Sequence, residues 1–154
     1  HPEIVTTHSY DDRVATIESV KRAGVSTCSG GIIGMGESDD DIIDLALSLR
    51  AMDIDSIPVN FLTSIPNTPF ENKHELTPQR CLKTLCLFRF VNPSKEIRVA
   101  GGREVNLRSL QPLALYPANS IFVNGYLTTP GQEASDAHQM IRDLGFELDS
   151  PAAI

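Results

Sequence analysis

The sequence predicts an α/β fold built on a parallel sheet. Helical and extended patterns alternate along all 154 residues, and four extended runs are each followed by a helical one. Such alternation is typical of parallel strands joined by right-handed helical crossovers. Hydrophobic residues make up 41% and charged residues 21% of the chain, which is ordinary for one globular domain.

The first part of the chain is expected to form a helix, a strand, a second helix and a second strand. Residues 11–23 carry apolar side chains at helical spacing, and Gly24 is a suitable stop. The run "VSTC" (25–28) is predicted as a short strand that enters a glycine-rich loop. Ser38 is a candidate N-cap for a helix that begins with three aspartates, since carboxylates are favoured at a helix amino terminus. Residues 56–62 are the next predicted strand.

The second part of the chain repeats the alternation. Thr77 and Pro78 are an N-cap and a first-turn proline for a helix that is expected to reach about Val91. After it we predict a strand at 96–102 and a short leucine-rich helix at 107–113. A further strand at 119–125 and a last helix that ends at Gly145 follow.

Two architectures fit four such units. A doubly wound sheet closes as a domain at this length, whereas a complete (β/α)8 barrel needs roughly 200 residues or more. Half a barrel leaves an inner sheet face and strand edges uncovered, which proteins normally avoid. The pattern alone therefore favours the doubly wound sheet.

Charge and cysteine content narrow the class of protein. A formal charge of −7 argues against a nucleic-acid partner, for which a basic stripe is expected. No run approaches the roughly 18 apolar residues of a membrane span, so no membrane partner is expected. Three cysteines are an odd number and do not indicate a disulfide framework, which favours a reducing, cytoplasmic location.

The stretch "CSGGIIGMGE" (28–37) is the first candidate site. Cys28 is either a buried structural thiol or a thiolate ligand of a metal or cluster at the mouth of the sheet. The glycines indicate a close approach of the backbone to another group. A phosphate cradle is weakly supported, because the Walker lysine and the G-x-G-x-x-G spacing are both absent. An adenosine or amino-acid moiety lying against the loop, with Ile32 as an apolar surface, remains open.

Other polar and thiol side chains fall at strand ends or on helices. Cys81 and Cys86 lie on the helix that Pro78 starts, and core packing is the better interpretation for both. Arg103 follows two glycines in "AGGRE" and would either turn into a ligand crevice or pair with a neighbour such as Glu104. The remaining polar residues at or just beyond predicted strand ends are Asn60, Ser120, Thr128 and Thr129.

Taken together, seven segments carry a resemblance to one enzyme family. They are "TTHSYDDR", "AGVSTCSGGIIGMGE", "SIPVNFL", "NTPF", "RVAGGRE", "ANSIF" and "YLTTPGQ". In this order and at these separations they resemble the carboxyl-terminal half of the biotin synthase family, which are radical S-adenosylmethionine enzymes. The resemblance spans nearly the whole chain, and the segments are specific jointly although not singly.

The resemblance implies a fold that the pattern alone did not favour. Residues 1–154 would be the second half, the last four βα units, of a (β/α)8 TIM barrel of the radical S-adenosylmethionine type. The CxxxCxxC loop that holds the family's 4Fe-4S cluster is not in this sequence. These residues by themselves are therefore expected to be inactive.

The implied activity is that of a sulfurtransferase. Dethiobiotin would be converted to biotin by sulfur from an auxiliary 2Fe-2S cluster, after hydrogen abstraction that S-adenosylmethionine makes possible. Implied partners are an electron-donor protein such as flavodoxin or ferredoxin, and a second copy of the full-length protein in a homodimer.

Carried over by position, the resemblance also implies residue roles. Cys28 would be a thiolate ligand of the 2Fe-2S cluster and Arg103 its fourth ligand, and these two are the expected catalytic and metal-binding residues. An arginine ligand is unusual because guanidinium stays protonated. The other implied roles are Ile32, Gly30, Gly31 and Gly34 for the adenosyl group, Asn60 for the ureido ring of dethiobiotin, Ser120 beside the cluster, and Thr128 and Thr129 for the substrate carboxylate.

Two alternatives remain at this stage. One is another radical S-adenosylmethionine barrel enzyme, although such relatives need not combine a cysteine at position 28 with "AGGRE". The other is a non-catalytic α/β module that binds an adenosine-like ligand.

Overall fold

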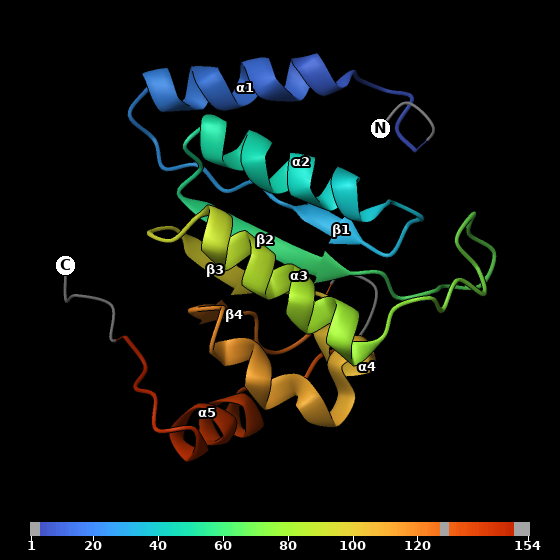
Figure 1. Cartoon of the computed structure of the whole chain (residues 1–154), viewed down its shortest axis with the longest axis vertical. Helices are drawn as coiled ribbons and strands as arrows, with labels where there is room; N and C mark the ends of the chain where they lie inside the picture. The colour runs from blue at the N-terminus through green and yellow to red at the C-terminus, as the bar shows by residue number, and fades with distance from the viewer. Residues whose placement is uncertain (1–3, 127–129, 150–154) are drawn as a thin grey trace.

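A computed structural model describes residues 4–126 and 130–149. Four parallel strands form one sheet, in the spatial order β1-β2-β3-β4 (Figure 1). The strands are β1 (Gly31–Ile33), β2 (Ser56–Phe61), β3 (Glu96–Val99) and β4 (Ser120–Ile121).

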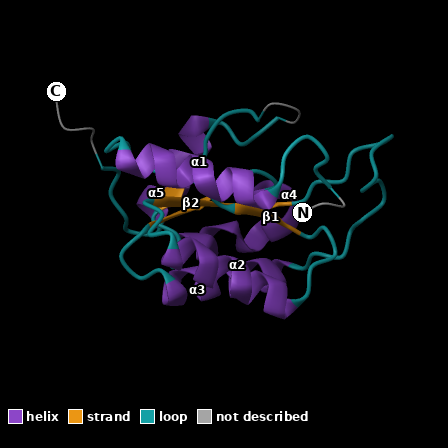
Figure 2. Ribbon diagram, turned by 90° about the horizontal axis from the view of Figure 1, so that it is seen from above, coloured by secondary structure: helices purple, strands orange, loops and turns teal. Residues whose placement is uncertain are grey.

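Helices connect the strands, and two of them, α2 and α3, cover one face of the sheet. Figure 2 shows α2 and α3 together on one side of the strands, with α1 on the other side. The helices are α1 (Tyr10–Arg22), α2 (Asp39–Ala51), α3 (Pro78–Val91), α4 (Arg103–Leu107), the 3-10 helix η1 (Arg108–Leu115) and α5 (Ala134–Asp143). None of the described helices is long and apolar enough to cross a membrane.

The predicted helix starts are confirmed by their caps. The Ser38 hydroxyl accepts the backbone N–H of Asp41, whose carboxylate in turn accepts the Ser38 N–H, which is a capping box. The Thr77 hydroxyl accepts the N–H of Arg80 ahead of the first-turn proline. A second capping box, formed by Ser9, starts α1 one residue earlier than predicted.

The first predicted strand was misplaced. The strand predicted at 25–28 is only a single parallel bridge between Cys28 and Ser56, and β1 lies within the stretch predicted to be a loop. The offset between partners is the same at both places, since Cys28 faces Ser56 and Gly31 faces Val59. The ladder is interrupted between them because Pro58 has no N–H to donate.

The later strands are also shorter than predicted. Runs 96–102 and 119–125 were expected to be strands, but β3 ends at Val99 and β4 has only two residues. Gly102 adopts a left-handed conformation, with φ of 76°, and so ends the extended run and starts α4. The leucine-rich helix predicted at 107–113 is the end of α4 followed by η1.

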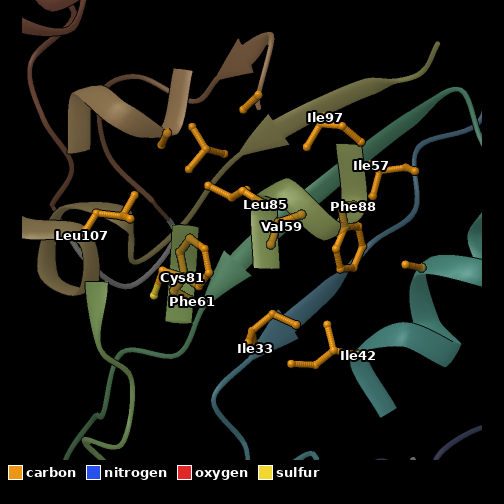
Figure 3. Close-up of a cluster of buried hydrophobic side chains, with 14 of the residues drawn as sticks. Ile33, Ile42, Ile57, Val59, Phe61, Cys81, Leu85, Phe88, Ile97 and Leu107 are labelled. Atoms are coloured by element: carbon orange, nitrogen blue, oxygen red, sulfur yellow. The ribbon is translucent and has the colours of Figure 1, made fainter. Parts of the chain in front are cut away.

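The core lies between the sheet and the helices α2 and α3. Side chains of β2 and β3 point into it and meet Leu85 and Phe88 of α3 (Figure 3). Cys81 is fully buried there, as predicted. Cys86 is exposed, so its predicted place in the core was wrong. Five residues along a helix turn the side chain by about 140° away from Cys81, towards solvent.

The strand order separates the two architectures. A doubly wound sheet reverses its strand order around a switch point, whereas here sequence neighbours are also spatial neighbours from β1 to β4. A strictly sequential parallel order, with crossover helices α2 and α3 on one face, is consistent with part of a barrel.

Candidate functional site

The two faces of the sheet carry different chemistry. Ile57, Val59 and Phe61 of β2 are buried against the helices. The residues between them point the other way, because successive side chains of a strand alternate. We call the face opposite α2 and α3 the open face. Its chemically notable residues are Cys28, Ile32, Asn60, Arg98 and Ser120.

Cys28 supplies the only thiol of the open face among the described residues. It is exposed and forms no disulfide. It lines a cavity of about 520 Å³ between α1 and residues 26–29. Its partner Ser56 is the first residue of β2, so Cys28 lies at the amino-terminal end of the ladder. The expectation that it stands at the carboxyl end was therefore wrong.

Backbone contacts fix the segment that carries this thiol. The carboxylate of Asp55 accepts the Thr27 N–H at 2.7 Å and the Thr27 hydroxyl at 3.0 Å. The Ser29 N–H donates to the Ser56 carbonyl at 3.0 Å. The Thr27 N–H, with help from its hydroxyl, lowers the pKa of Asp55. Cys28 is thus held between two residues that are both anchored.

Arg98 is the arginine that shares the open face with Cys28. In the register of the sheet, Arg98 is the partner of Pro58 on β2 and of Ser120 on β4, two residues further along the strands than the level of Cys28 and Ser56. Its Nε donates to the Ser120 hydroxyl at 3.0 Å, and its Nη2 donates to Glu96 at 2.7 Å. The guanidinium also lies 5.1 Å from the centre of the Phe122 ring. Sequence reasoning missed Arg98, although its place between the apolar Ile97 and Val99 signals the opposite face.

Arg103 lies in a different place from the one expected. It is the first residue of α4, beyond the carboxyl end of β3, and its side chain is 0% exposed. Its guanidinium donates to Gln132 Oε1 and to the Phe122 carbonyl, each at 3.0 Å. Cys28 lies at the amino-terminal end of the strands, whereas Arg103 lies beyond their carboxyl ends. The structure therefore does not bring these two expected ligands together.

Asn60 and Ile32 are adjacent on the open face. They are register partners in β1 and β2. The Asn60 side chain donates to the Gly31 carbonyl at 3.3 Å and accepts the Gly101 N–H at 3.0 Å. Ile32 is 46% exposed, which is high for an apolar strand residue. Together they present an oriented carboxamide beside an uncovered apolar side chain.

Protein neighbours already account for the three glycines of the expected adenosyl site. A Cβ on Gly30 would lie 1.9 Å from the Pro58 carbonyl oxygen, and one on Gly31 would lie 2.7 Å from Leu45 of α2. Gly34 has φ of 107° and also faces a leucine. The backbone approach that these glycines allow is therefore an approach to other parts of the chain.

A glutamate and a lysine shape the end of the same loop. Glu37 accepts the Gly34 N–H at 2.7 Å and the Met35 N–H at 2.8 Å. Lys73, from the long connection before α3, donates to the Met35 carbonyl at 2.8 Å. The loop that follows β1 is thus pinned by charged groups on both sides.

The remaining expectations divide between tested and untested positions. Ser120 lies beside Arg98 on the open face, and its expected place beside the cluster stays a prediction. Thr128 and Thr129 fall outside the described residues. Within 4–126 and 130–149, no three His, Cys, Asp or Glu side chains gather closely enough to hold a metal ion. Cys28 would therefore need ligands from beyond these residues to hold a cluster.

Comparisons with known proteins agree with this arrangement. The model of the Biotin and Thiamin Synthesis associated domain matches residues 58–147. The chain is 65% identical to biotin synthase of Geobacillus kaustophilus over 149 residues, which are 97% of this chain and 45% of that protein. It is 63% identical to biotin synthase of Bacillus subtilis (strain 168) over 150 residues, again 97% of this chain and 45% of that protein.

These matches show which part of the related proteins this chain corresponds to. The chain spans about half the length of the curated relatives it matches. The matched domain begins within β2 and covers β3, β4 and the helices between and after them, which carry most of the open face. The chain belongs to the biotin synthase family, of which it matches the carboxyl-terminal portion.

Proposed function

We propose that this chain acts as the carboxyl-terminal half of a biotin synthase, completing a (β/α)8 barrel and taking part in sulfur insertion into dethiobiotin. The observation that carries the proposal is the 65% identity to a biotin synthase over 97% of the chain. The open face gives the activity a location, because it offers an exposed thiol, an arginine and an oriented carboxamide on one surface.

The donor set of the open face suits one corner of an iron–sulfur cluster. Iron–sulfur clusters are held by cysteine thiolates. Cys28 is the exposed thiol on this face, whereas Cys81 is buried in the core and burial raises its pKa to about 12. Cys28 would hold the 2Fe-2S cluster together with thiolates from the other half. When bound, the two clusters and S-adenosylmethionine supply the sulfur and the radical chemistry.

Arg98 is a better candidate than Arg103 for the arginine beside that cluster. Both lie in "RVAGGRE", in which the resemblance assigns the ligand role to Arg103. Arg98 shares the face of Cys28, while the two Nη groups of Arg103 are committed to Gln132 and Phe122. Ser120 and Glu96 orient the Arg98 guanidinium from two sides.

The other residues of the open face bind and orient the organic reactants. Asn60 retains one amide N–H and one oxygen lone pair for the ureido group of dethiobiotin. Ile32, next to it, would exclude water from the adenosyl group of S-adenosylmethionine. Thr128 and Thr129 are proposed to hold the substrate carboxylate, for which neutral hydroxyl donors are suitable. A flavodoxin- or ferredoxin-like electron donor and a second copy of the complete protein are proposed as partners.

The test is biotin formation by the complete protein. We expect anaerobically reconstituted protein to convert dethiobiotin to biotin when S-adenosylmethionine and a reductant are supplied. A reconstituted protein that cleaves S-adenosylmethionine but leaves dethiobiotin unchanged would contradict the proposal and favour another radical enzyme of the same barrel type.

A pair of arginine variants tests the assignment of the ligand. Arg98→Ala should change the Mössbauer and absorption spectra of the 2Fe-2S cluster, because it removes the arginine side chain that shares the open face with Cys28. Arg103→Met should leave these spectra unchanged and instead lower the midpoint of thermal unfolding, since it breaks a buried hydrogen-bonded cation. The reverse pattern would restore Arg103 as the ligand.

A further inference from the structure

Glu104, on the first turn of α4, is contacted by two separate stretches of chain. It accepts the Tyr126 hydroxyl at 3.1 Å through Oε1 and at 3.3 Å through Oε2. It also accepts the Gln132 N–H at 3.0 Å. Arg103 lies 3.2 Å from the same carboxylate and is itself fully buried. One carboxylate therefore joins both stretches to the end of β3.

The two stretches are also joined to each other. The Asn124 N–H donates to the Gln132 carbonyl at 3.0 Å. Gly131 lies so close to Asn124 that an added Cβ would be 1.7 Å from the Asn124 carbonyl oxygen. Arg103 bonds to Phe122 on one side and Gln132 on the other. Residues 122–126 and 130–132 are thus fixed as one unit against the start of α4.

This unit brings an aromatic ring next to Asn60. The Tyr126 hydroxyl lies 3.4 Å from the Ala100 carbonyl oxygen. Carbons of its ring lie 3.7 and 3.8 Å from the point that a Cβ on Gly101 would occupy, and Asn60 Oδ1 lies 3.1 Å from the same point. Burial raises the pKa of Tyr126 to about 12, so the phenol stays protonated and can donate to Glu104. Tyr126 and Asn60 therefore both lie close to the same side-chain position of Gly101.

We propose that Glu104 is a positioning residue that fixes the Tyr126 ring as one wall of the dethiobiotin site, beside the carboxamide of Asn60. The inference rests on the proposed function and adds to it a residue, Tyr126, that contributes to substrate specificity. Because the Tyr126 hydroxyl is committed to Glu104, the ring is the part left to meet a ligand. An aromatic wall next to a carboxamide suits a reactant that joins a polar ureido group to apolar methylenes.

Dethiobiotin binding by the complete protein tests the proposal. Tyr126→Phe removes only the hydroxyl that Glu104 holds, and we expect it to raise the Kd about threefold to tenfold, the usual range for a lost partly buried hydrogen bond. Tyr116→Phe is the matched control, because that tyrosine is 65% exposed at the end of η1 and its loss should not change the Kd. Iron and sulfide contents should stay normal in both variants.

A conservative variant separates positioning from general stability. Glu104→Gln keeps an oxygen that can accept from Tyr126, and should bind dethiobiotin nearly as well as the parent protein. Glu104→Leu removes the acceptor and should weaken binding as much as Tyr126→Phe. Equal binding by Glu104→Leu and the parent would overturn the proposal.

A double-mutant cycle gives the readout that a purely structural role would not move. Tyr126→Phe and Asn60→Ala should be non-additive, with the Tyr126 effect reduced at least about twofold when Asn60 is already replaced, because neighbouring side chains couple. Additive effects would overturn the inference. If Asn60→Ala weakens binding but Tyr126→Phe does not, this inference fails and the proposed function stands. A complete protein that does not bind dethiobiotin would overturn both.

Discussion

The covered face and the open face of the sheet are made by alternate residues of the same strands, yet they differ in composition and exposure. On the covered face, Ile57, Val59, Ile97 and Val99 are each no more than 1% exposed. On the open face, Arg98 makes polar contacts and Asn60 has hydrogen-bonding capacity left over. One face of the sheet therefore specifies the fold, while the other is free to carry chemistry.

Adjacent isoleucines of β1 give the sharpest test of this difference. Ile33 is 1% exposed on the covered face, whereas Ile32 is 46% exposed on the open face. Ile33→Ala should lower the free energy of unfolding by about 2–5 kcal/mol, the usual cost of a buried isoleucine cut to alanine. Ile32→Ala should cost less than about 1 kcal/mol. Denaturant unfolding of the complete protein measures both.

Equal losses of unfolding free energy at these two positions would contradict the difference between the faces, because they would mean that the open face is packed as tightly as the covered one. Binding of S-adenosylmethionine is a second measurement that distinguishes the two faces. Ile32→Ala should weaken S-adenosylmethionine binding more than Ile33→Ala does, if the open face is the side that meets the cofactor.

The pH dependence of the segment next to Cys28 gives a smaller expected effect. The pKa of Asp55 is lowered mainly by the N–H of Thr27. A lowered pKa in the folded state means that the ionised carboxylate stabilises the fold at neutral pH, and that this contribution is lost as pH falls below the ordinary aspartate range, about pH 4. Asp55→Asn should therefore lower the unfolding midpoint at pH 7 more than at pH 3.

A difference in midpoint between Asp55→Asn and the parent that stays constant from pH 7 to pH 3 would contradict this account. Asp40→Asn is a suitable control. Asp40 is an exposed residue on the first turn of α2, away from the Cys28 segment.

Local signals predicted most of the helices but little of the sheet's detail. Ser38 and Thr77 predict the starts of their helices correctly, because capping depends on residues only a few positions away. The start of β1 depends on Pro58, which lies almost thirty residues later and interrupts the ladder. No local pattern contains that information, so the strand predicted at 25–28 was misplaced.

The candidate site was predictable only in part, because residue type is local information whereas the face on which a residue lies depends on the whole sheet. Residue types and the family resemblance predict roles for Cys28, Ile32, Asn60 and Ser120, and these roles stay predictions, although the strand pairing puts all four on the open face. Arg103 is assigned the ligand role by the family resemblance, and Arg98 is not among the predicted site residues. The alternation of Ile97, Arg98 and Val99 places Arg98 on the face opposite the core, but the sequence alone does not tell which face of the sheet is open.

The most direct test of the account is the iron and acid-labile sulfide content of Cys28→Ser in the complete protein, measured beside Cys86→Ser. Both thiols are exposed, but Cys28 lies on the open face and Cys86 on the helix α3 that covers the other face. We expect Cys28→Ser to lose or destabilise the 2Fe-2S cluster and Cys86→Ser to keep it. A normal 2Fe-2S content in Cys28→Ser, or its loss in Cys86→Ser, would contradict the claim that the open face carries the chemistry.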